Sequence, residues 1–153
     1  MEYQFADGFW WGSPPPAPQS EGAAARDGKS RNIFDYWFEI APERFHDRVG
    51  PAEASTFYDH FRADIGLLKT LGHNTFRTSI SWSRLIPGGD GEVNPQAVAF
   101  YNAMIDELLA QGITPFINLY HFDMPLSLAE RYNGFTDRRV MDAFIRYGQK
   151  MIA

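Results

Sequence analysis

The order of strand-like and helix-like segments limits the fold of this chain more than any other feature of its sequence. Stretches rich in β-branched and aromatic residues alternate with longer stretches in which apolar residues recur every three or four positions, the spacing of one helix face. The predicted strands lie near residues 9–12, 75–80 and 114–119, and the predicted helices lie near residues 55–71, 95–111 and 137–152. Strands that alternate with helices pair in parallel through right-handed βαβ units, so the sequence predicts an α/β fold.

The ends of the predicted helices carry residues that commonly start or stop a helix. Gly72 and Gly112 follow the first two helices, where a glycine often adopts the left-handed conformation that ends a helix. Asn94 stands before Pro95, which predicts an N-cap followed by a proline in the first turn. Thr136 is expected to cap the third helix.

A long insertion separates the first predicted strand from the first long helix. Residues 13–53 are polar and irregular apart from a short helical turn near 33–38, and insertions of this length in a compact domain are usually functional. Two architectures fit the order of segments, an open doubly wound sheet and part of a (β/α)8 barrel. The open sheet usually carries a glycine-rich phosphate loop after its first strand, whereas this chain has the proline-rich Pro14–Pro18 there. Large polar and aromatic residues near the strand ends, which form the catalytic face of a barrel, favour the barrel.

The composition excludes several classes of protein. Fourteen Lys+Arg against nineteen Asp+Glu give a net charge of −5, which argues against a broad nucleic-acid surface. The chain has no cysteine, and its four histidines lack metal-binding spacing, so we expect no disulfide, no metal and no cofactor. No apolar run reaches the roughly 18 residues of a membrane span, and the first residues do not resemble a signal peptide. We therefore expect a cytoplasmic protein that binds neither a membrane nor nucleic acid.

Four segments of the chain resemble glycoside hydrolase family 1. Phe9–Ser13 and Gln19–Gly22 are similar to the family's N-terminal signature, Phe76–Pro87 to its second strand and Asn118–Pro125 to its third. The resemblance runs along nearly the whole chain, in order and with the family's spacing. The sequence Arg77-Thr78-Ser79 and the segments around Asp35 and His121 look most like the 6-phospho-β-glucosidase branch of the family.

The resemblance implies a (β/α)8 barrel of which residues 1–153 form the N-terminal part, about three βα units. It also implies hydrolysis of β-linked sugars with retention by two glutamates, an acid/base in an Asn-Glu-Pro motif after the fourth strand and a nucleophile after the seventh. This chain contains no Asn-Glu-Pro sequence, so we expect no catalytic residue within it, and we expect the isolated chain to be inactive without a C-terminal barrel segment. A β-glucoside or phospho-β-glucoside is the implied substrate.

Five residues match positions that the resemblance assigns to the substrate site. Gln19 and His121 match residues that hydrogen-bond sugar hydroxyls, and Arg77 matches the arginine that keeps the nucleophile ionised. Trp82 and Phe122 are candidates for lining the cleft, although core packing is the favoured interpretation of Trp82. Side chains of these types also commonly have purely structural roles. If they bind the sugar, we expect Gln19 and His121 to converge on one concave surface, with Arg77 deeper between them.

Two further observations bear on the site. The proline run fixes φ and removes amide donors immediately before Gln19, which affects where that side chain lies. Glu21 is the one acid within a family motif, and a structural ion pair is favoured for it over catalysis. Two rival functions remain open at this point: a non-catalytic sugar-binding or partner-completed barrel segment, and an unrelated flavodoxin-like binding protein that is a compact monomer.

Overall fold

The sheet of this protein is short, parallel and ordered along the chain. The structure is a computed structural model that describes residues 3–152. Its sheet contains β1 (Gly12–Ser13), β2 (Thr75–Ser79) and β3 (Thr114–Asn118), in the order β1-β2-β3. Each neighbouring pair is parallel, and β2 and β3 stay in register along their whole length, from Thr75 opposite Thr114 to Ser79 opposite Asn118. The parallel pairing of β2 and β3 agrees with the barrel interpretation.

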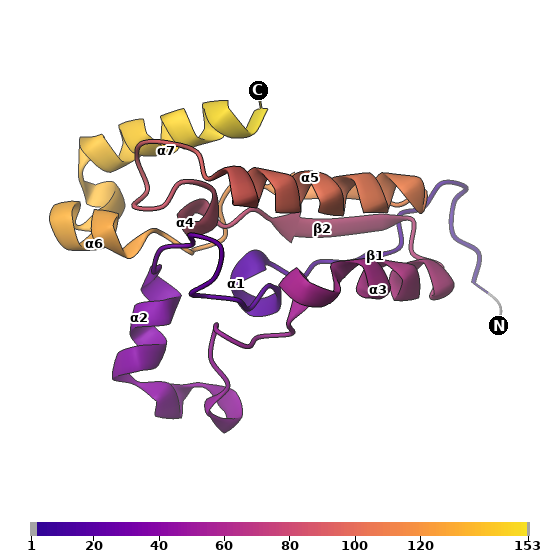
Figure 1. The fold of residues 1–153 in the computed structure, drawn as a ribbon. Helices are drawn as coiled ribbons and strands as arrows, with labels where there is room; N and C mark the ends of the chain where they lie inside the picture. Colours follow the sequence, from indigo (N-terminus) through magenta and orange to yellow (C-terminus); the bar gives the residue numbers. More distant parts are fainter. Residues whose placement is uncertain (1–2, 153) are drawn as a thin grey trace.

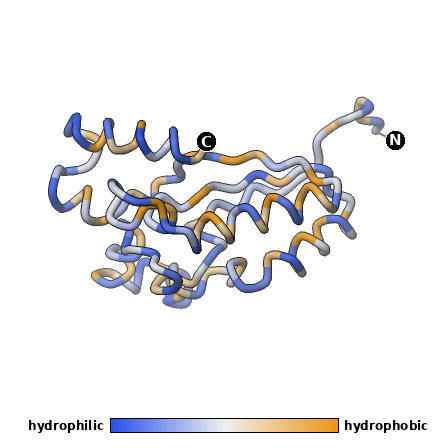
Figure 2. The backbone as a smooth tube through the Cα atoms, turned by 45° about the horizontal axis from the view of Figure 1, so that its top comes forward, coloured by the Kyte–Doolittle hydropathy of each residue, from blue (hydrophilic) through white to orange (hydrophobic). Residues whose placement is uncertain are grey.

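Helices follow each strand and cover the sheet (Figure 1). The three long helices are α3 (Phe57–Thr70), α5 (Pro95–Ala110) and α7 (Arg138–Ile152). Shorter helices are α1 (Ala17–Ser20), α2 (Ile33–Ile40), α4 (Trp82–Leu85) and α6 (Leu126–Tyr132), with 3₁₀ turns at Pro42–Arg44, His46–Arg48 and Gly134–Thr136. Polar and apolar residues alternate along the long helices (Figure 2), so each helix has one face to bury. No helix in the described range 3–152 has both the length and the apolar character needed to span a bilayer.

The core lies between the sheet and the long helices. Ile65 of α3, Phe76 of β2 and Leu108 of α5 are fully or almost fully buried there. At the other end of the sheet, Trp82 stacks on Tyr147 of α7 with ring centroids 5.1 Å apart. One continuous cluster of buried hydrophobic residues therefore joins the sheet to all three long helices.

The second and third strands and all three long helices confirm the sequence-based expectations, whereas the first strand differs. β1 is only Gly12–Ser13, and the aromatic run Phe9–Trp11, expected to be a buried strand, is half exposed. Trp10 packs on Phe116 of β3 with ring centroids 4.4 Å apart. The strand begins at the glycine because a Cβ at Gly12 would lie 2.4 Å from the carbonyl oxygen of Thr75, so only glycine allows this approach of the two backbones.

The helix starts are partly as expected. Asn94 caps α5, since its side-chain oxygen accepts the backbone N–H of Gln96. The expectation that Thr136 caps α7 is wrong, because Thr136 lies in a 3₁₀ turn and donates to the carbonyl of Asn133. Asp137 takes the capping role, with Oδ1 accepting the N–H of Arg139 at 2.8 Å.

The insertion between β1 and α3 contains more structure than a loop. The helical turn expected near 33–38 is α2, which starts with a capping box in which Asn32 and Asp35 each accept the other's backbone N–H. The proline run leads directly into α1, with Pro16 at its N-cap and a further proline in its first turn. The prolines therefore start the helix that carries Gln19.

Candidate functional site

Arg77 lies on the open face of the sheet. Alternate residues of a strand face the same side, so Thr75 and Arg77 share one face while Phe76 points into the helix-covered core. Nε of Arg77 donates to Oδ1 of Asn118 on β3 at 2.8 Å, which fixes the guanidinium along the sheet. Arg77 also lines a cavity of about 280 Å³ together with Trp10 and Phe116. This face would be the interior of a closed barrel.

His121 lies just beyond the end of β3, within electrostatic range of Arg77. Partial burial and the positive charge of Arg77 both lower the pKa of the His121 imidazole. The ring is therefore neutral at pH 7, with one nitrogen that donates and one that accepts, which suits a sugar hydroxyl. Arg77 and His121, both singled out from the sequence, are thus near enough to interact electrostatically.

Gln19 is exposed on α1 and lines a different cavity. That cavity has a volume of about 570 Å³ and is walled by aromatic rings, including Phe34 and Trp37 of α2 and Phe45. The cavity that contains Arg77 is lined instead by residues of the sheet and the segment before it. The convergence of Gln19 with His121 on one surface stays a prediction.

The two aromatic candidates for the cleft differ in position. Trp82 is 0% exposed, its Nε1 donates to the carbonyl of Gly89 at 2.9 Å, and its ring is enclosed by other aromatic rings. It is therefore a core residue, which is the interpretation favoured from the sequence, and its indole N–H is already hydrogen-bonded. Phe122 is 62% exposed, and its ring contacts the His121 ring edge-on at 5.2 Å. Phe122 is free to meet a ligand beside His121.

Glu21 forms the structural ion pair favoured from the sequence. Its Oε2 accepts a hydrogen bond from Nε of the fully buried Arg84 at 2.9 Å, and its Oε1 accepts one from the hydroxyl of Tyr101 at 2.7 Å. The Arg84 guanidinium also donates to the carbonyls of Gly22 and Ala23. Burial and the neighbouring carboxylate raise the pKa of Tyr101 well above its usual value, so its hydroxyl stays protonated and donates. Arg84 thereby holds the start of the insertion against α4.

Sequence reasoning missed the partners of this ion pair. Arg84 and Tyr101 lie far from Glu21 in the chain, 63 and 80 positions away. One signal was available: Arg84 is a lone charge within the four-residue helix Trp82–Leu85, all of which is buried, and a buried arginine requires an acidic partner.

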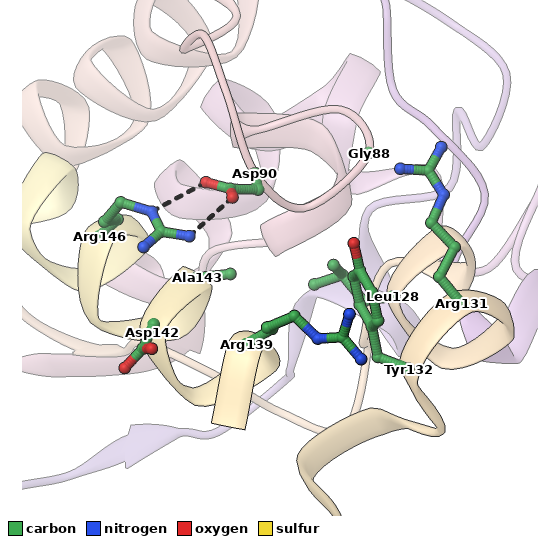
Figure 3. A pocket seen from close by; sticks show the side chains of 9 residues that line it. All are labelled: Gly88, Asp90, Leu128, Arg131, Tyr132, Arg139, Asp142, Ala143 and Arg146. Carbon is green, nitrogen blue, oxygen red and sulfur yellow. Dashed lines mark hydrogen bonds and ion pairs between the residues drawn. The ribbon is translucent and has the colours of Figure 1, made fainter. Parts of the chain in front are cut away.

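A third cavity, of about 360 Å³ and polar, lies between the turn at 88–90 and the helices α6 and α7 (Figure 3). Arg146 binds Asp90 there through two hydrogen bonds of 2.9 and 2.6 Å, drawn as dashed lines. Arg139, on the same wall, binds Asp137 in the same bidentate way. The charges of these arginines are thus largely neutralised, so the cavity is a set of surface ion pairs and not the candidate site.

Comparison with known proteins matches this arrangement to one family. The sequence profile described as "Glycosyl hydrolase family 1" matches residues 1–153. The chain is 57% identical to the 6-phospho-beta-glucosidase GmuD of Bacillus subtilis over 148 residues, which cover 97% of this chain and 32% of that protein. It is 39% identical to the cyanogenic beta-glucosidase of Trifolium repens, over 95% of this chain and 35% of the relative.

Solved structures agree with the sequence relatives. Aphid myrosinase superposes with a TM-score of 0.91 at 31% identity, over 97% of this chain and 32% of its own. A family 1 β-glucosidase from Thermotoga maritima superposes with a TM-score of 0.87 at 36% identity, over 94% and 32%. This chain spans about a third of the length of the proteins that it matches. Its fold is the N-terminal part of a (β/α)8 barrel.

Proposed function

Because this chain belongs to glycosyl hydrolase family 1, we propose that it supplies the first three βα units of a retaining β-glycosidase that acts on 6-phospho-β-glucosides. The observation that carries the proposal is the 57% identity to a 6-phospho-beta-glucosidase, in a chain where Arg77 lies within β2 and His121 lies just beyond the C-terminal end of β3, near enough for the charge of Arg77 to lower the pKa of the imidazole. Active sites of (β/α)8 barrels are built from residues at these strand ends.

In the proposed reaction, His121 and Gln19 bind the sugar and Arg77 acts on the nucleophile. The neutral imidazole of His121 and the amide of Gln19 each donate to and accept from sugar hydroxyls. Arg77 is held by Asn118 on the face that a closed barrel would enclose, where its charge lowers the pKa of a nearby carboxyl group. A nucleophilic glutamate beside Arg77 would therefore stay ionised at neutral pH.

The two carboxyl groups of the reaction come from outside these 153 residues in this proposal. Retaining hydrolysis needs a nucleophile and an acid/base about 5–5.5 Å apart. The relatives are about three times as long as this chain, and the rest of the barrel would supply both groups. The proposed substrate is a sugar phosphate, which carries charge and does not cross a bilayer unaided, and this supports a cytoplasmic location.

A chimera tests the proposal directly. This chain would replace the matching N-terminal segment of the Bacillus subtilis relative, and the product would be assayed on p-nitrophenyl β-glucoside and on its 6-phosphate. We expect the chimera to hydrolyse the phosphorylated substrate with the higher kcat/KM and the isolated chain to hydrolyse neither. An active isolated chain would contradict the proposal, and a preference for the unphosphorylated substrate would contradict the assigned substrate class.

Two substitutions in the chimera test the site residues. Gln19→Ala and His121→Ala should each lower kcat/KM about two- to tenfold, the effect of losing one hydrogen bond to the substrate. Gln111→Ala and His60→Ala are the matched controls, since Gln111 ends α5 at the opposite end of β3 and His60 is exposed on α3. Equal activities of site variants and controls would show that the two residues do not bind the sugar. An inactive chimera that still binds glucosides would favour the non-catalytic sugar-binding alternative.

A further inference from the structure

The turn that carries His121 is strained and is held by a buried carboxylate. Phe122, the middle residue of this turn, has φ +61°, in the left-handed region that a bulky residue rarely adopts. Oδ1 of Asp123 accepts the backbone N–H of His121 at 3.4 Å, across the strained residue. This contact closes the turn and sends the Phe122 ring outward, where it contacts the His121 ring.

The Asp123 carboxylate is buried although it is only partly hydrogen-bonded. Its side chain is 0% exposed, and Oδ2 has no hydrogen-bond partner among residues 3–152. The hydroxyl of Ser81, just before α4, lies near the Asp123 carboxylate and favours its charged form, which opposes the rise in the pKa of Asp123 that burial causes. Burying a carboxylate with incomplete hydrogen bonding costs free energy, so a fold keeps one where geometry demands it.

A chain of buried hydrogen bonds leads from Ser81, which lies near Asp123, to the segment that carries Gln19. The backbone N–H of Ser81 donates to the hydroxyl of Tyr101 at 2.9 Å, and that hydroxyl donates to Glu21 at 2.7 Å. Glu21 lies two residues after Gln19, as Asp123 lies two residues after His121. The network therefore joins the segments that follow β1 and β2, and Asp123, after β3, lies beside it.

We propose that Asp123 is the positioning residue of His121: by accepting the His121 N–H and closing the turn at Phe122, it fixes where the imidazole lies relative to the sugar. Asp123 is buried away from the surface and acts on the substrate only through His121. This inference rests on the proposed function, because it assigns to His121 the contact with the sugar.

A double-mutant cycle in the chimera tests whether Asp123 acts through His121. Asp123→Ala should lower kcat/KM about tenfold and weaken binding of a non-hydrolysable S-linked glucoside by a similar factor. In the His121→Ala background, Asp123→Ala should cause less than a twofold further change, because the group that it positions is already gone. Asp123→Asn retains an acceptor for the His121 N–H and should recover most of the lost activity.

Val140→Ala is the control for a general loss of stability. Val140 is fully buried on α7 outside the network, so its truncation should lower the melting temperature and leave kcat/KM unchanged. Multiplicative losses in the double variant, or no recovery in Asp123→Asn, would overturn the inference while leaving the proposed function intact. An inactive chimera with the unchanged chain would instead overturn the proposed function, and the inference with it.

Discussion

At the scale of single residues, Glu21 and Arg84 form a buried ion pair whose two partners depend on each other. Both side chains are nearly or fully removed from water, and the guanidinium also lies 4.2 Å from the centroid of the Tyr58 ring. Such a pair contributes little net stability compared with apolar residues, but losing one partner leaves a buried charge without compensation. The pair is therefore sensitive to substitution on either side.

Glu21→Gln should destabilise the chimera by about 3 kcal/mol, because it leaves the Arg84 charge buried and unpaired. Urea unfolding would measure the change. Asp59→Asn is the matched control, since it breaks the exposed ion pair of Asp59 with Arg26 and should cost less than about 1 kcal/mol. Equal losses in the two variants would show that Glu21 does not compensate a buried charge.

Asp123 should make the stability depend on pH in an unusual direction. Burial, with a contribution from the nearby charge of Glu21, raises the pKa of Asp123 to about 6, above its unfolded value of 3.8. Between these pH values the folded state holds a proton that the unfolded state has lost, so this group's contribution to stability is greatest at low pH and falls as pH rises through 6. Tyr101, Tyr120 and Tyr147 are nearby and stay protonated, because their pKa values are raised.

The comparison of the unchanged chimera with Asp123→Asn isolates this contribution. The unfolding free energy of the unchanged protein, minus that of Asp123→Asn, should decrease between pH 4 and pH 7 by on the order of 2–3 kcal/mol. Urea titrations at a series of pH values would measure it. A difference that stays constant across this range would mean that Asp123 has an ordinary pKa.

At the scale of elements, the residues that cap the helices differ in how much they contribute to the stability of the fold. Asn94 caps α5 and also donates through Nδ2 to the carbonyls of Asp27 and Arg84. Thr56 stands at the same position of α3 but makes no capping hydrogen bond, and it has φ +55°. The start of α5 is therefore tied to the insertion and to α4, and the start of α3 is not tied by its cap residue.

Asn94→Ala should lower the unfolding free energy by about 2–3 kcal/mol, since it removes a cap and leaves buried carbonyls without a donor. Thr56→Ala should change it by less than about 1 kcal/mol, because no cap is lost. Thermal or urea unfolding of the two chimeras would compare them. A larger loss at Thr56 than at Asn94 would contradict this account of the helix starts.

At the scale of the whole molecule, the sheet has two unpaired strand edges and one face with partly exposed aromatic side chains. Within residues 3–152, β1 and β3 each pair with β2 alone, and Trp10 and Phe116 lie partly exposed on the open face. Strand edges with unpaired N–H and C=O groups and apolar neighbours promote association between chains. In a closed barrel the same groups would be paired and enclosed.

The isolated 153-residue chain should therefore self-associate as its concentration rises from micromolar towards millimolar, whereas the chimera should stay monomeric. Sedimentation velocity at several concentrations would measure both. A monomeric, well-folded isolated chain over this range would show that its open edges are protected, and would agree better with an independent binding module.

The sequence by itself determined the features that depend on neighbours along the chain. The content of β-branched and aromatic residues was enough to predict β2 and β3, the spacing of apolar residues predicted the three long helices, and the pair Asn94 and Pro95 marked a helix start. These features are local, because the period of a helix or strand is set by backbone geometry within a few residues. The motifs were long enough for the family to be identified from the residues themselves.

The tertiary structure alone decided how distant residues meet. It placed Phe9–Trp11 outside a strand and put Gln19 and Arg77 in different cavities. Glu21 meets Arg84 across 63 positions and Tyr101 across 80. Which buried charges pair at such separations depends on how the layers stack, and no local period encodes that.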